Sequence, residues 1–290
     1  MLILKFEHIT PLLFIMRIAV YFRDDSVLNG ERFSSMEKRL SSASFELYRI
    51  TSGADIKDGT GMVLSVGGDG TFLSASKRVG SSGIPVLGIN TGRVGFLSEY
   101  SPEEACDALL RGAYSLEDRA LLETRIDGYM IGSDSSFWPY TLNEISVLRG
   151  GASILGVDVS LDGNPLPTYW ADGLLVSTSS GSTAYSLSVG GPICVPESKV
   201  IIIAPVAPHN LNVRPLVVPD TTEVSISMRS RDKEVAMSMD NRNVRLSAEA
   251  KLYVKVAQFS LKRVRLEKSS FIKALTTKLF WGEDIRNGGF

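Results

Sequence analysis

The spacing of apolar residues changes along this chain of 290 residues, and that change constrains the fold more than any other feature. Before about residue 119, short apolar runs alternate with segments whose apolar residues lie three or four positions apart, such as Phe33, Met36 and Leu40. After it, apolar and polar residues alternate, as in residues 122–127 and 157–161. The first pattern is typical of a parallel sheet covered by helices, and the second of strands with one buried face.

These patterns predict two domains and a terminal helix. An N-terminal α/β domain with a mainly parallel sheet would span residues 16–118, and a β-rich C-terminal domain residues 119–265. Helical spacing returns within residues 266–290, so we expect a helix that packs back on the N-terminal domain. Because ligands commonly bind between domains, the functional site is expected at their junction.

The apolar segment of residues 1–15 contains charged residues and Pro11, and no small-residue cleavage site follows it. It is therefore unlike a signal peptide, and it is too short for a helix that spans a membrane. We expect it to be dispensable and to reflect an upstream start codon.

Charge and rare residues narrow the function classes. The 31 basic and 32 acidic residues nearly cancel, so the basic surface that binds nucleic acid is not expected. Two cysteines, Cys106 and Cys194, are too few for a disulfide framework and indicate a reducing compartment. We therefore expect a cytoplasmic protein that binds neither nucleic acid nor membrane. With only His8 and His209 and no metal-binding motif, no metal site built by the protein itself is expected.

The strongest local signal is the sequence GGDGTFL at residues 67–73. It follows an apolar strand and begins a helix, which is where open parallel sheets bind ligands. Glycines let the backbone approach a phosphate, and amides at a helix start favour anions. A carboxylate would repel that phosphate unless it serves the chemistry, so Asp69 predicts phosphoryl transfer in which it orients or deprotonates a hydroxyl. The alternative is a tight turn with Asp69 as helix N-cap.

Other nucleotide-binding motifs are missing from the sequence. It contains no Gly-Lys pair and no G-x-G-x-x-G, which argues against a P-loop protein and an ordinary Rossmann dehydrogenase.

Three further segments contain candidate binding residues. Residues 90–97 (NTGRVGFL) suit a loop that closes over a nucleotide, although Phe96 can equally be a core residue. Asn143 and Glu144 offer donors and acceptors for ribose hydroxyls. Residues 171–185 (ADGLLVSTSSGSTAY) can present hydroxyls and amides to a sugar or phosphate. The alternative for this last segment is a serine-rich turn and helix cap, with Tyr185 half buried.

In this order the segments resemble the NAD kinase family, which is related to diacylglycerol kinases and phosphofructokinases. The resemblance rests on six matches: GGDGTFL at 67–73, GRVGFL at 92–97, NE at 143–144, ADG at 171–173, GSTAY at 181–185 with the following GGP, and PHNLNVRPLVVP at 208–219. It covers about residues 16–265, nearly the whole chain.

The resemblance implies transfer of a phosphoryl group from ATP, or from another triphosphate or polyphosphate, to the adenosine ribose 2′-hydroxyl of NAD. Asp69 would be the general base, and Mg²⁺ or another divalent cation would be carried by the nucleotide phosphates. A homodimer or homotetramer is implied, in which a neighbouring subunit completes the nicotinamide pocket. The implied binding residues are Gly67, Gly68, Gly70 and Thr71 along the donor phosphates, Arg93 in the following loop, and Phe96, Asn143, Glu144, Asp172, Ser182, Thr183, Ala184, Tyr185 and Ser188 around NAD.

One segment departs from the family pattern. Where the family often has Asp-Gly-Gln, this chain has Asp240, Asn241 and Arg242. Asparagine tolerates a left-handed turn nearly as well as glycine, so we expect the turn to persist. Arg242 leaves open the contact made there, including the choice of donor.

Rival functions remain open to test. Lipid kinases and phosphofructokinases share a GGDG-like loop, but neither accounts for both the NE pair and GSTAY. A non-catalytic dinucleotide sensor is the alternative from another class. Asp69 argues against a sensor, because a binding module has no use for a carboxylate that faces phosphates.

Overall fold

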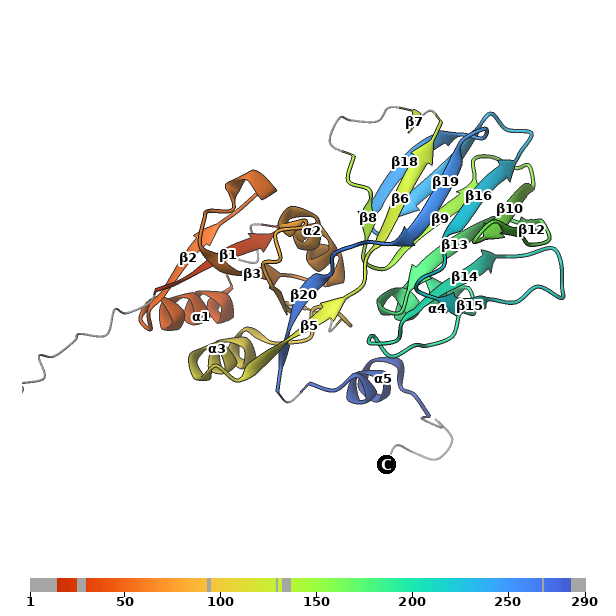
Figure 1. Ribbon diagram of the computed structural model, residues 1–290. Coiled ribbons are helices and arrows are strands. Elements are labelled where there is room, and N and C mark those ends of the chain that lie inside the picture. The colour runs from red at the N-terminus through yellow and green to blue at the C-terminus, as the bar shows by residue number, and fades with distance from the viewer. Residues whose placement is uncertain are drawn as a thin grey trace, which may run out of the picture.

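The computed structural model describes residues 15–24, 30–92, 95–128, 130–131, 137–267 and 269–282. Figure 1 shows a sheet with α1, α2 and α3 on one side of the molecule and two further sheets on the other, with α5 beside their junction. We call these two bodies the α/β domain and the β-rich domain. The segment 1–14 and Arg93 lie outside the described residues.

The α/β domain contains one six-stranded sheet in the order β2-β1-β3-β4-β20-β5. Its strands are parallel except β5, which pairs antiparallel with β20, so the predicted mainly parallel sheet is confirmed. The elements are β1 (Met16–Phe22), α1 (Glu31–Ser41), β2 (Phe45–Arg49), the 3₁₀-helix η2 (Gly53–Asp55), β3 (Thr60–Val66), α2 (Asp69–Val79), β4 (Val86–Ile89), α3 (Pro102–Arg111), β5 (Tyr114–Arg119) and β20 (Leu261–Leu266).

Side-chain alternation explains why helices cover both faces of this sheet. Ile18 and Val20 pack with residues of α1 and α3, whereas Ala19 and Tyr21, their neighbours on β1, pack with residues of α2. Successive residues of a strand point to opposite faces, so a strand that is apolar throughout needs a layer on each side. α2 is thereby fixed with its N-terminus at the carboxyl end of β3.

The β-rich domain consists of two antiparallel sheets that enclose one core. Their orders are β11-β10-β16-β19-β6-β8, with β12 on β10, and β15-β14-β13-β9-β17-β18-β7. Val157 and Leu252 of the first sheet share a hydrophobic cluster with Ile145 and Leu174 of the second. The strands are β6 (Leu122–Asp127), β7 (Met130–Ile131), β8 (Tyr140–Thr141), β9 (Glu144–Arg149), β10 (Leu155–Leu161), β11 (Asn164–Pro165), β12 (Tyr169–Ala171), β13 (Gly173–Thr178), β14 (Val200–Val206), β15 (Leu216–Pro219), β16 (Val224–Arg229), β17 (Glu234–Met239), β18 (Arg242–Ser247) and β19 (Lys251–Val256).

The chain then returns to the α/β domain. We predicted from the sequence that residues 261–265 belong to the β-rich domain. This is wrong, because β20 pairs with β4 and β5 of the six-stranded sheet. The predicted terminal helix is α5 (Phe271–Leu279), and the Phe271 ring lies 6.3 Å from the ring of Phe96, centroid to centroid. α5 thus lies against the loop that follows β4. Among the described residues, no helix is long and apolar enough to cross a lipid bilayer.

Candidate functional site

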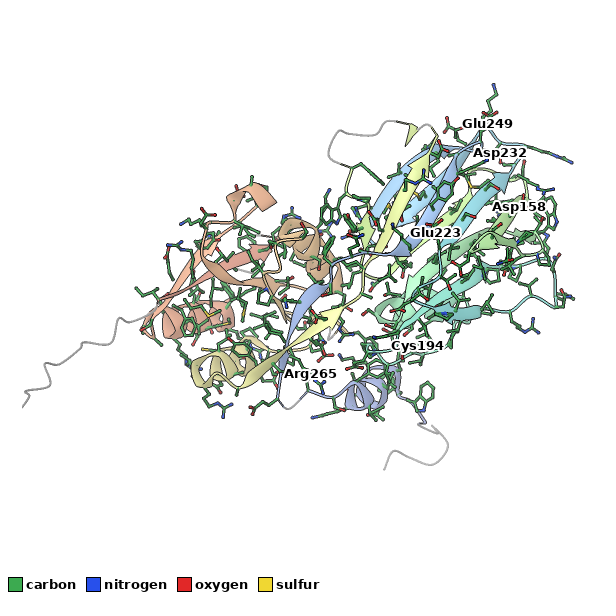
Figure 2. The ribbon with its side chains drawn as sticks, viewed as in Figure 1. Asp158, Cys194, Glu223, Asp232, Glu249 and Arg265 are labelled. Carbon is green, nitrogen blue, oxygen red and sulfur yellow. The ribbon has the colours of Figure 1, made fainter. Side chains whose placement is uncertain are left out.

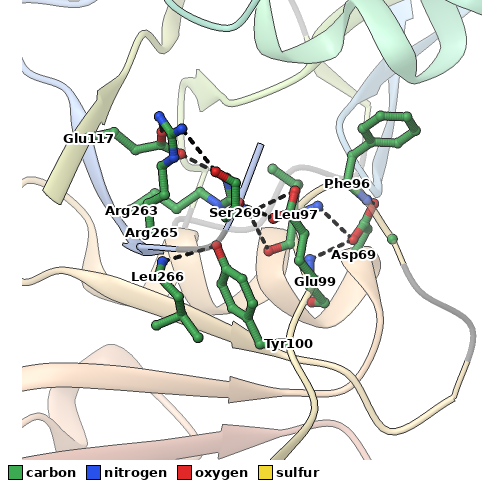
Figure 3. Close-up of polar contacts among 12 residues, drawn as sticks. Asp69, Phe96, Leu97, Glu99, Tyr100, Glu117, Arg263, Arg265, Leu266 and Ser269 are labelled. Carbon is green, nitrogen blue, oxygen red and sulfur yellow. Dashed lines mark hydrogen bonds and ion pairs between the residues drawn. The ribbon is translucent and has the colours of Figure 1, made fainter. Parts of the chain in front are cut away.

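Asp69 is the first residue of α2 and lies directly after the glycine-rich turn. Gly67 has φ of 147°, and a Cβ there would lie 2.5 Å from Thr71 Oγ1, so only glycine fits. The carboxylate of Asp69 accepts hydrogen bonds from the backbone N–H groups of Phe96 (2.9 Å), Leu97 (3.0 Å) and Ser98 (2.9 Å) (Figure 3). Gly68 occupies the N-cap position, so the alternative in which Asp69 caps the helix is wrong.

Residues 95–98, which we call the Asp69 loop, orient this carboxylate and, among the described residues, leave it one acceptor position. Oδ1 accepts from Leu97 and Ser98, whereas the one described donor to Oδ2 is the N–H of Phe96. A carboxylate offers about four lone-pair positions, so Oδ2 can still accept a proton or hydrogen bond from a ligand hydroxyl. A Cβ on Gly95 would overlap the carboxylate, so this close approach also depends on glycine. The loop therefore fixes where Asp69 can accept a proton.

Glu144 is the buried carboxyl group of the second half of the site. It begins β9 and is 8% exposed, and its Oε2 has no hydrogen-bond partner within the described residues. Burial, reinforced by the nearby Asp240, raises the pKa of Glu144 to about 8. A buried carboxyl oxygen without a partner, on a group whose pKa is strongly raised, is a feature of ligand sites.

Asp240 fixes the backbone that presents Asn143 and Glu144. Its carboxylate accepts from the N–H groups of Leu142 (2.9 Å) and Asn143 (2.7 Å), and its own N–H donates to the Glu144 carbonyl (3.0 Å). Burial raises the pKa of Asp240, and the N–H groups of Leu142 and Asn143 offset this in part. The prediction from the sequence considered Asp240 only as part of a turn and did not include this role. The departure at residues 240–242 was the one signal that pointed to it.

The predicted GSTAY segment packs directly on Asn143. Ser177 Oγ donates to the Asn143 carbonyl (3.0 Å), and Thr178 Oγ1 donates to the Leu142 carbonyl (2.6 Å). The 3₁₀-helix η3 (Ser180–Thr183) and α4 (Tyr185–Ser188) follow β13. A Cβ on Gly181 would overlap the Asn143 carbonyl, so the two segments meet only because residue 181 is glycine. The hydroxyls of Ser177 and Thr178, which precede GSTAY, therefore stabilise the backbone of the site.

Ser182 differs from its neighbours in GSTAY. Its side chain is fully buried and bonds to both the N–H (3.0 Å) and the carbonyl (3.2 Å) of Cys194, which is labelled in Figure 2. Thr183, Ala184 and Tyr185 are half-buried, and Ser188 is exposed. These four, rather than the Ser182 hydroxyl, are open to a ligand.

The turn at residues 240–242 joins the two halves of the site. Asn241 Nδ2 donates to the Gly70 carbonyl (3.1 Å) and to Ser74 Oγ (3.1 Å), both on α2. The turn between β17 and β18 persists, as expected, but its left-handed residue is Asp240, with φ of 52°, and not Asn241. The Arg242 guanidinium donates to the carbonyls of Trp138 and Tyr140, both at 2.5 Å, and thereby fixes the segment that precedes Asn143.

Two family models match most of this chain. The ATP-NAD kinase N-terminal domain matches residues 14–114, and the ATP-NAD kinase C-terminal domain matches residues 142–266. The chain belongs to the NAD kinase family. This family makes it a kinase, so the family and the enzyme class predicted from the sequence are confirmed.

Relatives and solved structures agree with this assignment. The chain is 44% identical over 229 residues to an NAD kinase of Bacteroides fragilis, with 78% of each chain covered. It is 38% identical over 265 residues to an NAD kinase of Flavobacterium psychrophilum, with 90% of each covered. An NAD kinase from Archaeoglobus fulgidus in complex with ATP superposes with a TM-score of 0.72 at 25% identity, covering 87% of this chain and 95% of that one. Yeast NADH kinase complexed with NADH gives a TM-score of 0.79 at 22% identity, covering 94% and 89%, which shows the shared fold.

The NAD kinase residues expected from the sequence are not all brought together. Phe96 and Thr183, which come from different domains, line one cavity. Asp172 lies at the opposite end of β13 from η3, about 20 Å away at the usual rise of a strand. There its Oδ1 is 2.9 Å from Nε of Arg149. Asp172 therefore lies apart from Thr183 and the other residues that follow β13 within one chain.

Proposed function

We propose that this NAD kinase family member transfers a phosphoryl group from ATP, or from another triphosphate or polyphosphate, to the adenosine ribose 2′-hydroxyl of NAD. The observation that carries the proposal is the Asp69 carboxylate, which three backbone N–H groups orient while no other described residue fills its remaining acceptor position on Oδ2. It lies at the N-terminus of α2, where backbone amides favour phosphate oxygens. Gly68 is exposed, and a Cβ there would meet no atom of the described residues within 4 Å, so that face of the turn can receive a phosphate.

Asp69 accepts the hydroxyl proton in this mechanism. A ribose hydroxyl is a poor nucleophile at neutral pH, and a carboxylate is too weak a base to ionise it in advance. If the transition state is loose, the carboxylate need only orient the hydroxyl and accept its proton late. The open position on Oδ2 suits that role, because the bonds from the Asp69 loop prevent the carboxylate from turning away.

Asn143 and Glu144 are proposed to bind the adenosine of NAD. The Oε2 atom of Glu144 lacks a partner within the described residues, so a ligand hydroxyl or amino group would satisfy it. Asn143 precedes Glu144 in the chain and the Tyr185 backbone contacts it, while Phe96 and Thr183 line one cavity. Asp172 is proposed to contact the nicotinamide side of a dinucleotide bound by a second subunit, since it lies far from η3 in its own chain. This assignment requires a homodimer or homotetramer.

Magnesium is proposed to enter as part of the donor substrate. Across the part of the chain that the structure describes, no three His, Cys, Asp or Glu side chains are grouped to bind a metal ion. Triphosphate oxygens and water are ligands that Mg²⁺ prefers, so the nucleotide itself can carry the ion.

Activity of the purified protein with NAD, magnesium and ATP tests the reaction, with NADP measured by an NADP-specific dehydrogenase. Asp69→Asn is expected to lower kcat at least about a hundredfold and to leave NAD affinity within a few-fold, because it removes the proton acceptor. Asp58→Asn, an exposed carboxylate of the same domain, is the matched control. Near-normal turnover in Asp69→Asn would rule out the assigned role. NAD binding without turnover on any donor would favour the sensor, and turnover only with polyphosphate would change the donor alone.

A further inference from the structure

The Asp69 loop is itself bound by a helix outside the part of the chain that the family models match. The C-terminal family model ends at residue 266, and α5 follows it. Lys278 of α5 donates from Nζ to the carbonyl of Gly95, and the same Nζ lies 4.9 Å from the centroid of the Phe96 ring. Lys278 therefore contacts two consecutive residues of the loop whose N–H groups orient Asp69.

Lys278 is a nearly buried cation with a carboxylate partner. Its side chain is 11% exposed, and Nζ lies 3.4 Å from Oε1 of Glu99. Glu99 in turn accepts from Ser269 Oγ (2.8 Å) and lies 3.3 Å from the Arg263 guanidinium, whose side chain is 3% exposed (Figure 3). Moving Lys278 away would leave the buried charge of Glu99 less compensated, which is costly. The ion pair therefore fixes the position of Lys278.

The Asp69 carboxylate is within electrostatic reach of Lys278. Burial lowers the pKa of Lys278, while the negative charges of Glu99 and Asp69 favour its charged form. Since Lys278 does not bond to Asp69, its influence on that carboxylate passes through the loop backbone and through the field of its charge.

We propose that Lys278 is a positioning residue for phosphoryl transfer, an inference that rests on the proposed function. Its ammonium binds the Gly95 carbonyl and the Phe96 ring, and so fixes the N–H groups of residues 96–98 that orient Asp69. α5 thereby contributes to the reaction from the end of the chain. A catalytic group displaced by about 1 Å can lose about a hundredfold in rate, so a small shift of the loop suffices for a large effect.

Lys278→Met tests this inference, because methionine keeps most of the stem over Phe96 and removes the ammonium. We expect kcat to fall about 10- to 100-fold with KM for NAD within about twofold. Lys278→Arg, which keeps a cation and its donors, should restore most of the rate. Lys273→Met removes an exposed cation from the same helix and should have no effect. If Lys278→Met fails to fold, Lys278→Gln replaces it, because its amide falls one bond short of the Gly95 carbonyl and the same loss of kcat is expected.

A double-mutant cycle separates positioning from a general structural effect. If Lys278 acts through Asp69, Lys278→Met should cause little further loss in the Asp69→Asn background. Equal fold losses in both backgrounds, or a wild-type kcat in Lys278→Met, would overturn the inference. Equal losses in Lys278→Met and Lys273→Met would do the same. Wild-type turnover is measured first: its absence with every donor would defeat the proposed function, whereas an active wild type with an active Lys278→Met defeats only this inference.

Discussion

Replacing Glu144 by glutamine is expected to stabilise the fold at alkaline pH and to weaken NAD binding. Glu144 is 8% exposed and faces the buried Asp240, and together these raise its pKa to about 8. In the unfolded chain the same group returns to its ordinary value of 4.5. The native protein therefore binds a proton between pH 4.5 and 8 that the unfolded chain has released.

The sign and size of the effect follow from this difference in pKa. A native state that binds the extra proton loses stability as pH rises, at about 1.4 kcal/mol for each pH unit. The contribution of Glu144 to the free energy of unfolding therefore falls by about 5 kcal/mol between pH 4.5 and about pH 8, and it is constant above that. Glutamine has no such dependence, but its buried amide without a partner costs about 1–3 kcal/mol. The net gain for Glu144→Gln at pH 9 is then about 2–4 kcal/mol.

Urea unfolding at pH 5, 7 and 9, followed by tryptophan fluorescence, measures this. Glu144→Gln should be no more stable than wild type at pH 5 and should gain progressively at pH 7 and 9. Glu223→Gln, an exposed glutamate of the β-rich domain labelled in Figure 2, is the matched control and should follow the wild type throughout. The affinity for NAD, measured by calorimetry at pH 7, should fall in Glu144→Gln alone.

The reasoning is refuted if Glu144→Gln and wild type lose stability in parallel between pH 5 and 9. That result would mean that Glu144 is ionised in the native protein at neutral pH. A gain in stability with unchanged NAD affinity would support the raised pKa of Glu144 but contradict its proposed role in binding NAD.

Two further substitutions test contacts around Asp69. Gly95→Ala places a Cβ on the Asp69 carboxylate, so kcat should fall about as far as in Asp69→Asn, roughly a hundredfold. Gly92→Ala places a Cβ within 4 Å of no atom in the part of the chain that the structure describes, so this variant should stay active. Equal activities of the two alanine variants would contradict the close approach. Asn241→Ala removes the hydrogen bonds to Gly70 and Ser74 and should lower the free energy of unfolding by about 1 kcal/mol, read as a fall in Tm of about 2–4 °C, with Asn243→Ala as control. An unchanged Tm would show that the turn does not stabilise the domain junction.

Local patterns were sufficient to predict much of the fold. The capping box at Ser101 and Glu104 starts α3, and Gly112 ends it in a left-handed conformation, as expected for that residue. Asp162 and Gly163 both have positive φ in the turn between β10 and β11, which is what an Asp-Gly hairpin requires. In each case the residues that determine the structure lie within a few positions of one another.

The misplaced strand β20 shows where such patterns fail. Alternation in residues 261–266 predicts a strand with a buried face, but it does not specify which sheet the strand joins. β20 pairs with β5 about 145 residues earlier, as in the pair of Arg263 with Glu117. The buried ion pair between these two side chains, at 2.7 Å, depends on that pairing. The residues of neither strand indicate which strand it pairs with.

The candidate site was only partly predictable for the same reason. Asp69, Asn143 and Glu144 lie in recognisable segments, whereas the groups that orient them lie far away in sequence. The Asp69 carboxylate accepts from residues 27 to 29 positions later, and the backbone of Asn143 is bound by a carboxylate 97 positions later. Ser182, expected at the ligand, instead bonds to the backbone of Cys194.

These long-range contacts imply that the site forms only when the whole chain has folded. The N-terminal family match contains both Asp69 and its loop, yet the cation that binds the loop comes from α5, at the other end of the chain. The Asn143 backbone likewise depends on Asp240, and the turn after Asp240 contacts α2 of the other domain. The Asp69 half is thus completed by a helix from the far end of the chain, and the Asn143 half by a turn that also contacts α2.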